Sequence, residues 1–251
     1  TKLNISENQP FYAGTDNETE KIFFFADVPH LIKLFRNHFL DTGFILDNKV
    51  IDAEPIREIL LLEESDLRIS HKLTQEHLTV TQAGRQKVKL ATQLFSHSFS
   101  KAIRRCMSLG KTKSPNSVEC SDFLKCVNDW FDVYNSKCPA TDSRDRVKAF
   151  GLALDEQCKI ISMMSDTIRK LRTPKRMHLP FQKGVLLNNE SLPQLFKDLQ
   201  ENYNIKYIIT SRLNQDELEH FFGVIRSKGG LHDHPTCLEF RNRLRSCIHA
   251  H

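Results

Sequence analysis

The spacing of apolar residues along the chain predicts a mainly helical protein with short strands near both ends. Residues 22–26 (IFFFA) form an uninterrupted apolar run, which is typical of a strand buried on both faces. Asp27 follows directly, so we expect a carboxylate at the carboxyl end of that strand. From Pro29 the apolar residues recur with helical spacing, and Pro29 itself suits a first helical turn.

The next stretch of about 160 residues is predicted to be almost wholly helical. Its apolar stripes predict helices over residues 55–65, 81–109, 121–135 and 144–171. Beyond it, the pattern predicts short strands at 184–187 and 207–210, a helix around 192–203 between them, and a last basic helix over about 236–249.

The helix predicted over residues 214–227 bears two acids on its polar side. Asn214 can cap this helix, and Glu217, three residues later, can complete a capping box. Asp216 and Glu219 are spaced i and i+3, so both can reach one ligand or ion. The chain therefore has a strand and an acid at its start, a helix with two acids near its end and a helical body between. This layout indicates an insertion that splits a catalytic core.

The composition fits a soluble, folded protein, with 39% hydrophobic residues and a formal net charge of +5. Because no run approaches the roughly 18 apolar residues of a membrane span, a membrane protein is excluded, and the abundant Leu, Ile, Val and Phe argue against disorder. The seven cysteines include no CxxC pair, which predicts reduced thiols rather than disulfides or a zinc ribbon. Thr1 is not an initiator Met, so we expect a piece of a longer protein.

The positive charge is concentrated in one stretch. No acidic residue lies between Glu76 and Glu119. The Lys and Arg residues of that stretch are Arg85, Lys87, Lys89, Lys101, Arg104, Arg105, Lys111 and Lys113. Such a run is often a solvated helix face, but its length favours a polyanionic partner, either a nucleic-acid backbone or nucleotide phosphates.

Two short strings resemble nucleotide motifs but lack decisive residues. Gly110-Lys111-Thr112 is similar to the end of a P-loop, yet Arg105 occupies the position where that motif needs glycine. Asn48-Lys49-Val50 is similar to a guanine-reading motif, but Ile51 replaces its aspartate. A conventional G domain is therefore not expected, and no serine or cysteine nucleophile motif is present. Carboxylates from distant parts of the chain remain, and such groups can hold paired Mg²⁺ ions for phosphodiester chemistry. Each alone could equally be a capping or salt-bridging surface acid.

Two longer strings resemble the P element transposases, the family that includes the THAP-domain transposases of animals. Residues 25–33 (FADVPHLIK), followed by Arg36 and Asn37, resemble the family's DxPHLIK signature. Residues 212–222 (RLNQDELEHFF) resemble its LNQDxLExFF helix. The resemblance implies an α/β fold with a predominantly α insertion, an RNase H-like core interrupted by a helical GTP-binding domain. The implied domains are 1–45 and 206–251 for the core and 46–205 for the insertion.

The resemblance also implies roles for individual acids. Glu219 is implied to be the last of three carboxylates that bind catalytic Mg²⁺, with two aspartates upstream of Thr1. Asp27 and His30 are implied to support the core, since an Asp that accepts a hydrogen bond from a His fixes its orientation.

For GTP, the resemblance implies a guanine stacked on an aromatic ring and read by carboxylates. The matching positions are Phe131, Asp132 and Asn135, together with Asp216. Lys72, Lys87 and Ser96 are implied, less distinctively, to contact phosphate and sugar. Phe131 also lies on the apolar stripe of its own helix, where a core position is the ordinary expectation.

We therefore expect the latter part of a nuclear cut-and-paste transposase that binds GTP, transposon-end DNA and target DNA. No membrane partner is expected, and whether the protein forms homo-oligomers is left open. Paired Mg²⁺ ions in the intact enzyme would activate water and then a DNA 3′-hydroxyl. Without two of its three acids and without a THAP zinc finger, the chain alone is expected not to cleave DNA. One alternative is a domesticated relative that acts as a non-catalytic DNA-binding or interaction protein. A plain helical scaffold, which would bind no nucleotide, is another.

Overall fold

A computed structural model describes residues 5–13, 21–63, 74–139, 147–230 and 234–248. The chain divides into two compact units, residues 1–211 and 212–251, and each is described by itself. In the parts of the chain that the structure describes, no helix is long and apolar enough to cross a membrane.

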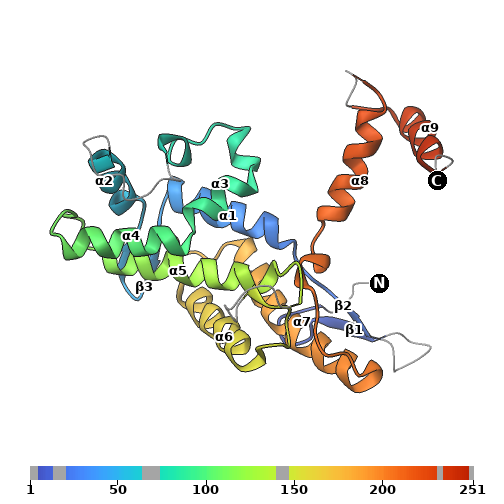
Figure 1. The fold of residues 1–251 in the computed structure, drawn as a ribbon, viewed down its shortest axis with the longest axis horizontal. Coiled ribbons are helices and arrows are strands. Elements are labelled where there is room, and N and C mark those ends of the chain that lie inside the picture. Colours follow the sequence, from blue (N-terminus) through green and yellow to red (C-terminus); the bar gives the residue numbers. More distant parts are fainter. Residues whose placement is uncertain (1–4, 14–20, 64–73, 140–146, 231–233, 249–251) are drawn as a thin grey trace. The chain divides into compact units, whose positions relative to one another are not determined.

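The first unit is built from helices with two small antiparallel sheets (Figure 1). Its helices are α1 (Val28–Asp41), α2 (Glu54–Glu63), α3 (Val88–Leu94), α4 (His97–Ser108), α5 (Ser117–Tyr134), α6 (Leu154–Lys170) and α7 (Pro180–Tyr203). Its strands are β1 (Phe11–Ala13), β2 (Lys21–Phe23), β3 (Phe44–Leu46) and β4 (Lys49–Ile51), and its short 3₁₀ helices are η1 (Gln75–His77) and η2 (Gly84–Gln86). A further 3₁₀ turn, η4 (Thr210–Leu213), begins at the end of this unit.

The core of this unit is an aromatic cluster around Phe35 of α1, which is fully buried. The Phe35 ring lies 4.7 Å from that of Phe181 in α7 and 6.2 Å from that of Trp130 in α5, measured between centroids. Phe95 and Phe123 complete the cluster with edge contacts. Because α1, α5 and α7 each place an aromatic ring here, burial of these rings holds the three helices together.

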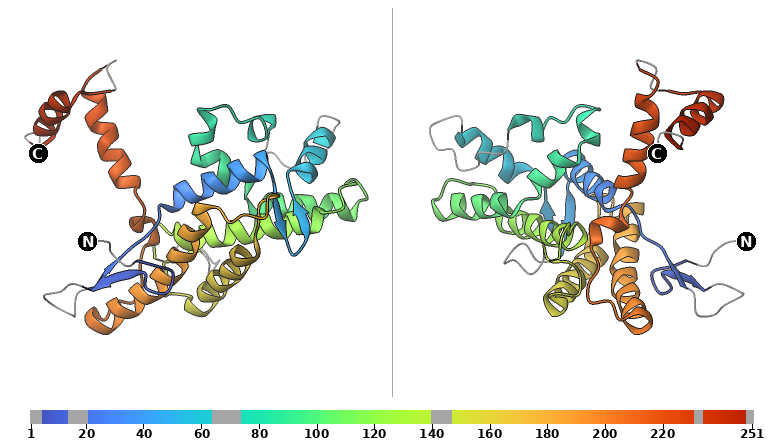
Figure 2. Two further views of the ribbon diagram at one scale, coloured as in Figure 1. Left: turned by 180° about the vertical axis from the view of Figure 1, so that it is seen from behind. Right: turned by 45° about the vertical axis from the view of Figure 1, so that its right-hand side comes forward.

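Helices α4 and α5 lie side by side and antiparallel (Figures 1 and 2). Small residues meet where they touch: the Ser100 hydroxyl donates to the Ser121 carbonyl at 2.9 Å, and the Ser121 hydroxyl donates to the Ser100 carbonyl at 3.0 Å. Both buried hydroxyls therefore have hydrogen-bond partners where the two helices approach closely.

The strand predicted over residues 22–26 is wrong in extent and in burial. Strand β2 ends at Phe23 and pairs with β1 alone, with Phe11 opposite Phe23. The side chain of Ile22 is 58% exposed, so the strand is not covered on both faces. Residues 24–27 belong to no strand, and they lead directly into α1.

Other elements differ from the predicted ones as well. The helix predicted over 81–109 is interrupted at Phe95 and Ser96, where α3 ends and α4 begins. The strand predicted at 184–187 is part of α7, which also includes the helix expected around 192–203. At 207–210 one bridge joins Ile208 to Phe150 instead of a strand. Helices α2, α5 and α6 confirm three predicted helices with shifted ends; residues 64–65 and 144–146 of those predictions lie outside the described residues.

The second unit consists of α8 (Asp216–Ser227) and α9 (Cys237–Ile248). The N-cap of α8 is Gln215 rather than the predicted Asn214, and the helix starts two residues later than predicted. Asn214 lies one residue before this cap, and its side-chain oxygen accepts from the Asp216 amide at 3.0 Å. The Phe222 and Phe240 rings, 6.2 Å apart, and a hydrogen bond from Arg243 to the Arg226 carbonyl join the two helices.

Candidate functional site

A polar stripe on α5 holds two of the residues implied to bind guanine. Asn128 and Asp132 are spaced i and i+4, so they share one face of α5, and Asn135 is the C-cap that follows the helix; all three are half-buried. The Asn128 amide nitrogen donates to Asp132 at 3.0 Å. Its oxygen accepts from the His97 backbone amide at 3.3 Å. Asn128 therefore joins Asp132 to the first turn of α4.

Ser96 is the N-cap of α4 and therefore lies beside His97, the residue that Asn128 contacts. Its hydroxyl accepts from the Phe99 backbone amide at 3.2 Å. The amides at the start of a helix carry partial positive charge, so this end of α4 favours an anion. The structure thus brings Ser96, Asp132 and Asn135 onto two neighbouring helix ends, connected by Asn128, which sequence reasoning missed. Its spacing of four residues before Asp132 was the available signal.

Phe131 is buried, with 8% of its surface exposed. That burial agrees with a position on the apolar stripe of α5. Stacking on a guanine would need a ring face that this packing largely covers, so the stacking role stays a prediction.

The loop that contains Lys87 is held by a buried arginine. Arg36 of α1 has no exposed surface, and its guanidinium donates to the backbone carbonyls of Gly84, Arg85 and Lys87 at 3.3, 2.5 and 3.2 Å. Burial lowers the pKa of Arg36, and the charge of Arg85 lowers it further. A guanidinium nevertheless remains protonated at neutral pH, so these donors are always present.

Lys87 itself is exposed, and its ammonium lies 3.8 Å from Glu76. It is the residue before α3, whereas Ser96 follows α3, so the seven-residue helix separates them by about 10 Å along its axis. The structure therefore does not place Lys87 in contact with Ser96. Lys72 lies outside the described residues.

Asp27 serves as the N-cap of α1. One of its carboxylate oxygens accepts from the His30 backbone amide at 3.0 Å, and the His30 side chain is exposed. The preceding residue is fixed by Asn188 of α7, whose side chain exchanges two hydrogen bonds with the Ala26 backbone at 2.7 and 2.8 Å. Asn188 was also missed; a buried polar pair, Asn188-Asn189, inside an apolar stretch was its signal.

Glu219 and Asp216 lie on the first turn of α8, and both are exposed. The Asn214 amide donates to the Asp216 carboxylate at 2.8 Å. Among the residues that the structure describes, no group of three His, Cys, Asp or Glu side chains could hold a metal ion. The role of Glu219 as a Mg²⁺ ligand therefore stays a prediction.

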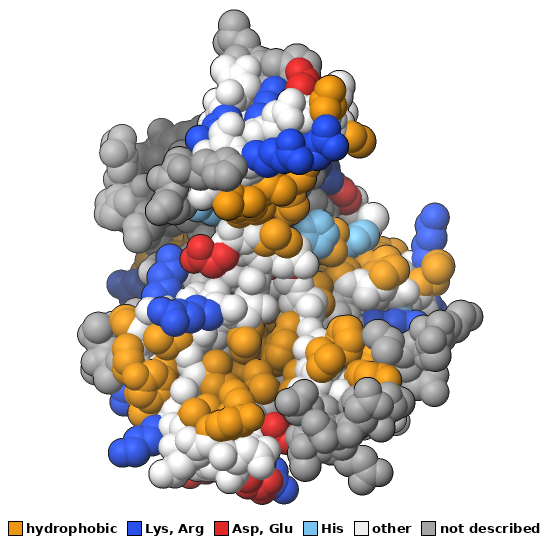
Figure 3. Space-filling model, turned by 90° about the vertical axis from the view of Figure 1, so that its right-hand side faces the viewer, with side chains coloured by type: hydrophobic (Ala, Val, Ile, Leu, Met, Phe, Trp, Pro, Cys, Tyr) orange, Lys and Arg blue, Asp and Glu red, His pale blue; other side chains and the backbone are white. Residues whose placement is uncertain are grey.

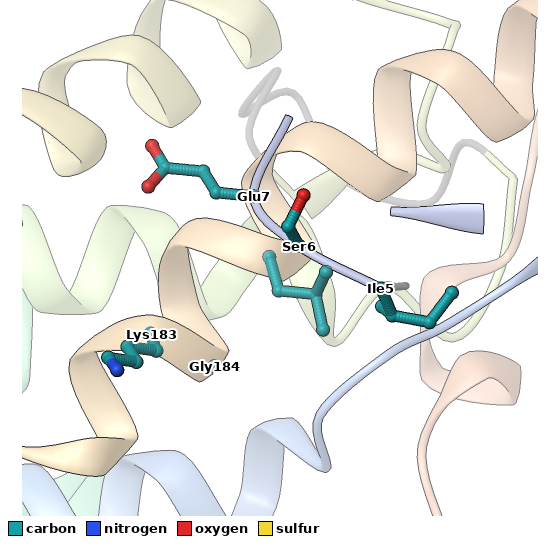
Figure 4. A pocket seen from close by; sticks show the side chains of 6 residues that line it. Ile5, Ser6, Glu7, Lys183 and Gly184 are labelled. Atoms are coloured by element: carbon teal, nitrogen blue, oxygen red, sulfur yellow. The ribbon is translucent and has the colours of Figure 1, made fainter. Parts of the chain in front are cut away.

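Two cavities of the first unit are lined by described residues other than the nucleotide candidates. One of about 450 Å³ lies between residues 5–7 and α7, lined by Ile5, Glu7, Lys183 and their neighbours (Figure 4). Another of about 300 Å³ lies beside Glu119 and Lys49. The hydrogen bond from Lys49 lowers the pKa of the Glu119 carboxyl. Lys49 and Glu119 therefore form an ion pair at the edge of this cavity.

Comparison with known proteins places the chain in a family. Residues 29–146 match the model of the TNP-like GTP-binding insertion domain, and residues 211–242 match that of the TNP-like RNase H C-terminal domain. The transposable element P transposase of Drosophila melanogaster is 47% identical over 249 residues, covering 99% of this chain and 33% of that protein. The chain belongs to the P element transposase family.

Two further comparisons also match members of the P element transposase family. The human DNA transposase THAP9 is 28% identical over 243 residues, covering 90% of this chain and 26% of its own length. The solved Drosophila P element transposase strand transfer complex matches with a TM-score of 0.91 and 48% identity, covering 98% of this chain and 56% of that chain. This chain thus spans a third or less of the curated relatives. The predicted family and the predicted fold class, a largely helical chain with a GTP-binding insertion and an RNase H-like C-terminal part, are confirmed.

Proposed function

We propose that the chain is the part of a nuclear cut-and-paste DNA transposase that binds GTP and supplies the last metal-binding carboxylate. The match of residues 29–146 to a GTP-binding insertion domain carries this proposal. Transposon ends and target DNA are its proposed substrates. The boundaries 46–205 for the insertion, with 1–45 and 206–251 in the RNase H-like core, belong to the proposal as well.

The guanine site is proposed on the α5 stripe. A carboxylate only accepts hydrogen bonds, so Asp132 suits the adjacent N–H groups on the edge of guanine, which adenine does not have in that arrangement. Asn128 orients Asp132 through its 3.0 Å hydrogen bond. Ser96 and the start of α4 provide a positive helix end for an anionic group nearby. Asn135 and Asp216 are proposed as further guanine ligands, Phe131 as the stacking ring and Lys72 and Lys87 as phosphate ligands.

Glu219 is proposed as a Mg²⁺ ligand, with Asp27 and His30 supporting the core. A bound Mg²⁺ supplies Lewis-acid chemistry at phosphodiester oxygens. What this chain contributes is an exposed carboxylate on the first turn of α8, where the helix end also stabilises negative charge.

Calorimetry with GTP and ATP tests the nucleotide assignment. We expect heat from GTP and much weaker binding of ATP. Asp132→Asn should weaken GTP binding by about tenfold or more, because it replaces an acceptor by a donor facing guanine, a loss of about 1.4 kcal/mol or more.

Asp122→Asn is the matched control. Asp122 is on the same helix, and its side chain is 56% exposed in an ion pair with Arg104. It should bind GTP as the parent chain does. The assignment would be wrong if the folded parent chain did not bind GTP, or if both variants lost the same amount of GTP affinity.

A further inference from the structure

A second acid-free stretch covers residues 167–189, outside the basic stretch between Glu76 and Glu119. Its cationic residues are Arg169, Lys170, Arg172, Lys175, Arg176 and Lys183. They follow one another from the end of α6 through the connecting loop to the first turn of α7. We call these six residues the 169–183 basic surface. All are exposed except Arg172, which is half-buried.

The loop that presents this surface is held by hydrogen bonds. The Arg176 amide donates to the Thr173 carbonyl at 2.7 Å, and the Thr173 amide donates to the Met177 carbonyl at 3.2 Å. The buried Thr173 hydroxyl also accepts from the Met177 amide at 3.2 Å. Arg176 has a φ of 57°, a conformation that this turn imposes. Lys175 and Arg176 are therefore held outward on a defined turn, which reduces the entropy lost on binding.

Two of the six cations are paired with carboxylates, and a third, Arg172, donates to the Arg169 and Leu171 carbonyls at 2.6 and 2.9 Å. Arg169 pairs with Glu7, and Lys170 lies 3.7 Å from Asp47. Both also lie in the last turn of α6, where a cation offsets the helix dipole. Their positive charge is partly neutralised within the first unit.

The other four cations lack that compensation. Within the described ranges, no carboxylate forms an ion pair with Arg172, Lys175, Arg176 or Lys183. Their field is felt locally: the pKa of His178 is lowered by partial burial and then by the charges of Arg172 and Lys183. Like charges held together cost free energy, and a polyanion relieves that cost.

The surface also has a shape suited to phosphate groups. Arg172 and Arg176 line an open cavity of about 340 Å³ with Lys170 and with Asp47, the partner of Lys170. Lys183 lies on the first turn of the 24-residue helix α7, whose amino-terminal end adds positive potential. A row of cations from consecutive segments fits the repeated charges of a nucleic-acid backbone better than one small anion.

We propose that the 169–183 basic surface binds the sugar-phosphate backbone of duplex DNA without reading its sequence. Its Lys and Arg side chains can neutralise phosphates along one strand. The proposal rests on the proposed function only in that a transposase supplies the DNA. It is separate from the α5 stripe and from Glu219.

Fluorescence anisotropy of the whole chain with a labelled duplex of about 20 base pairs tests this at several salt concentrations. We compare the parent with the triple variant Lys175→Gln, Arg176→Gln and Lys183→Gln. The slope of log K against log salt should become shallower by about 2.7, about 0.9 for each lost phosphate contact, and affinity should fall by about tenfold or more.

The triple variant Lys159→Gln, Lys197→Gln and Lys206→Gln is the matched control. It removes the same charge from three exposed lysines on α6, α7 and the segment after α7. It should keep the parent's slope. Equal weakening in both triples, no change in either, or equally tight binding of a poly-glutamate peptide would overturn the proposal. The heat of GTP binding is measured by calorimetry on the parent chain and both triple variants. If none of the three proteins binds GTP, that result counts against the GTP proposal, and the salt dependence of DNA binding still tests the basic surface.

Discussion

At the scale of single residues, buried polar side chains do most of the positioning in this protein. Arg36 fixes the loop before α3, and Asn188 fixes the backbone before α1. Asn189 accepts from both Trp130 and Tyr134 and donates to Ser165. Such groups are costly to bury without partners, and here the partners are backbone groups or other buried polar side chains. The sequence placed Arg36 in a motif, but nothing in the pattern revealed that three carbonyls surround it.

Replacing the buried guanidinium should therefore be strongly destabilising. Arg36→Met leaves the carbonyls of Gly84, Arg85 and Lys87 without their donor, and we expect a loss of about 3 kcal/mol in the free energy of unfolding. Urea denaturation measures it. Arg57→Met is the control, because Arg57 is exposed in a 3.1 Å pair with Glu54 and should cost less than about 1 kcal/mol. Similar costs in the two variants would contradict the anchoring role of Arg36.

At the scale of elements, predictions succeeded where one helix buries a clear stripe and failed where the stripe crosses a break. The apolar spacing continues through Phe95 and Ser96, yet the Ser96 hydroxyl caps a new helix there. Periodicity registers which face is buried, whereas a cap depends on one side chain. Likewise Val185, Leu186 and Leu187 form a short apolar run that periodicity cannot distinguish from a strand, and they lie within α7.

The candidate site shows the same division. The family resemblance named Asp132 and Asn135, and the structure places them on the last turn of α5 and at its C-cap. The sequence could not show that the start of α4 meets α5 through Asn128, because this contact joins residues 31 positions apart. Asp27 was expected to support a site through an imidazole, but the hydrogen bond comes from the His30 backbone.

The capping role of Asp27 predicts a distinct pattern of stability. Asp27→Ala should lower the free energy of unfolding by about 1 kcal/mol, because the His30 amide loses its acceptor. Asp27→Asn should cost only a few tenths of that, since asparagine caps helices equally well. Thermal or urea unfolding of both variants measures the difference. If the asparagine variant were as unstable as the alanine variant, negative charge rather than capping would be the property that matters.

At the scale of the whole molecule, the two units differ greatly in how much they bury. The first has a continuous aromatic core, whereas in the described part of the second only Ile225 is buried. A unit of about 40 residues with so small a core has little free energy with which to resist opening.

Hydrogen exchange should therefore separate the units. We expect the amides of α8 and α9 to exchange much faster than those of α1 and α5, whose apolar faces lie in the core. Mass spectrometry of peptides from each helix measures the rates. Equal protection in α5 and α8 would show that the second unit is stabilised by contacts other than its own buried residues.

The apolar face of α8 has a practical consequence for handling the protein. Leu218, Phe221, Phe222 and Val224 are each between 37% and 49% exposed, and apolar side chains show beside Lys and Arg on the face drawn in Figure 3. Exposed aromatic residues at this density promote self-association as concentration rises. The apparent molar mass from light scattering of the purified chain should thus increase with concentration. Polar substitutions at Leu218 or Phe221 would reduce this self-association without changing the core of the first unit.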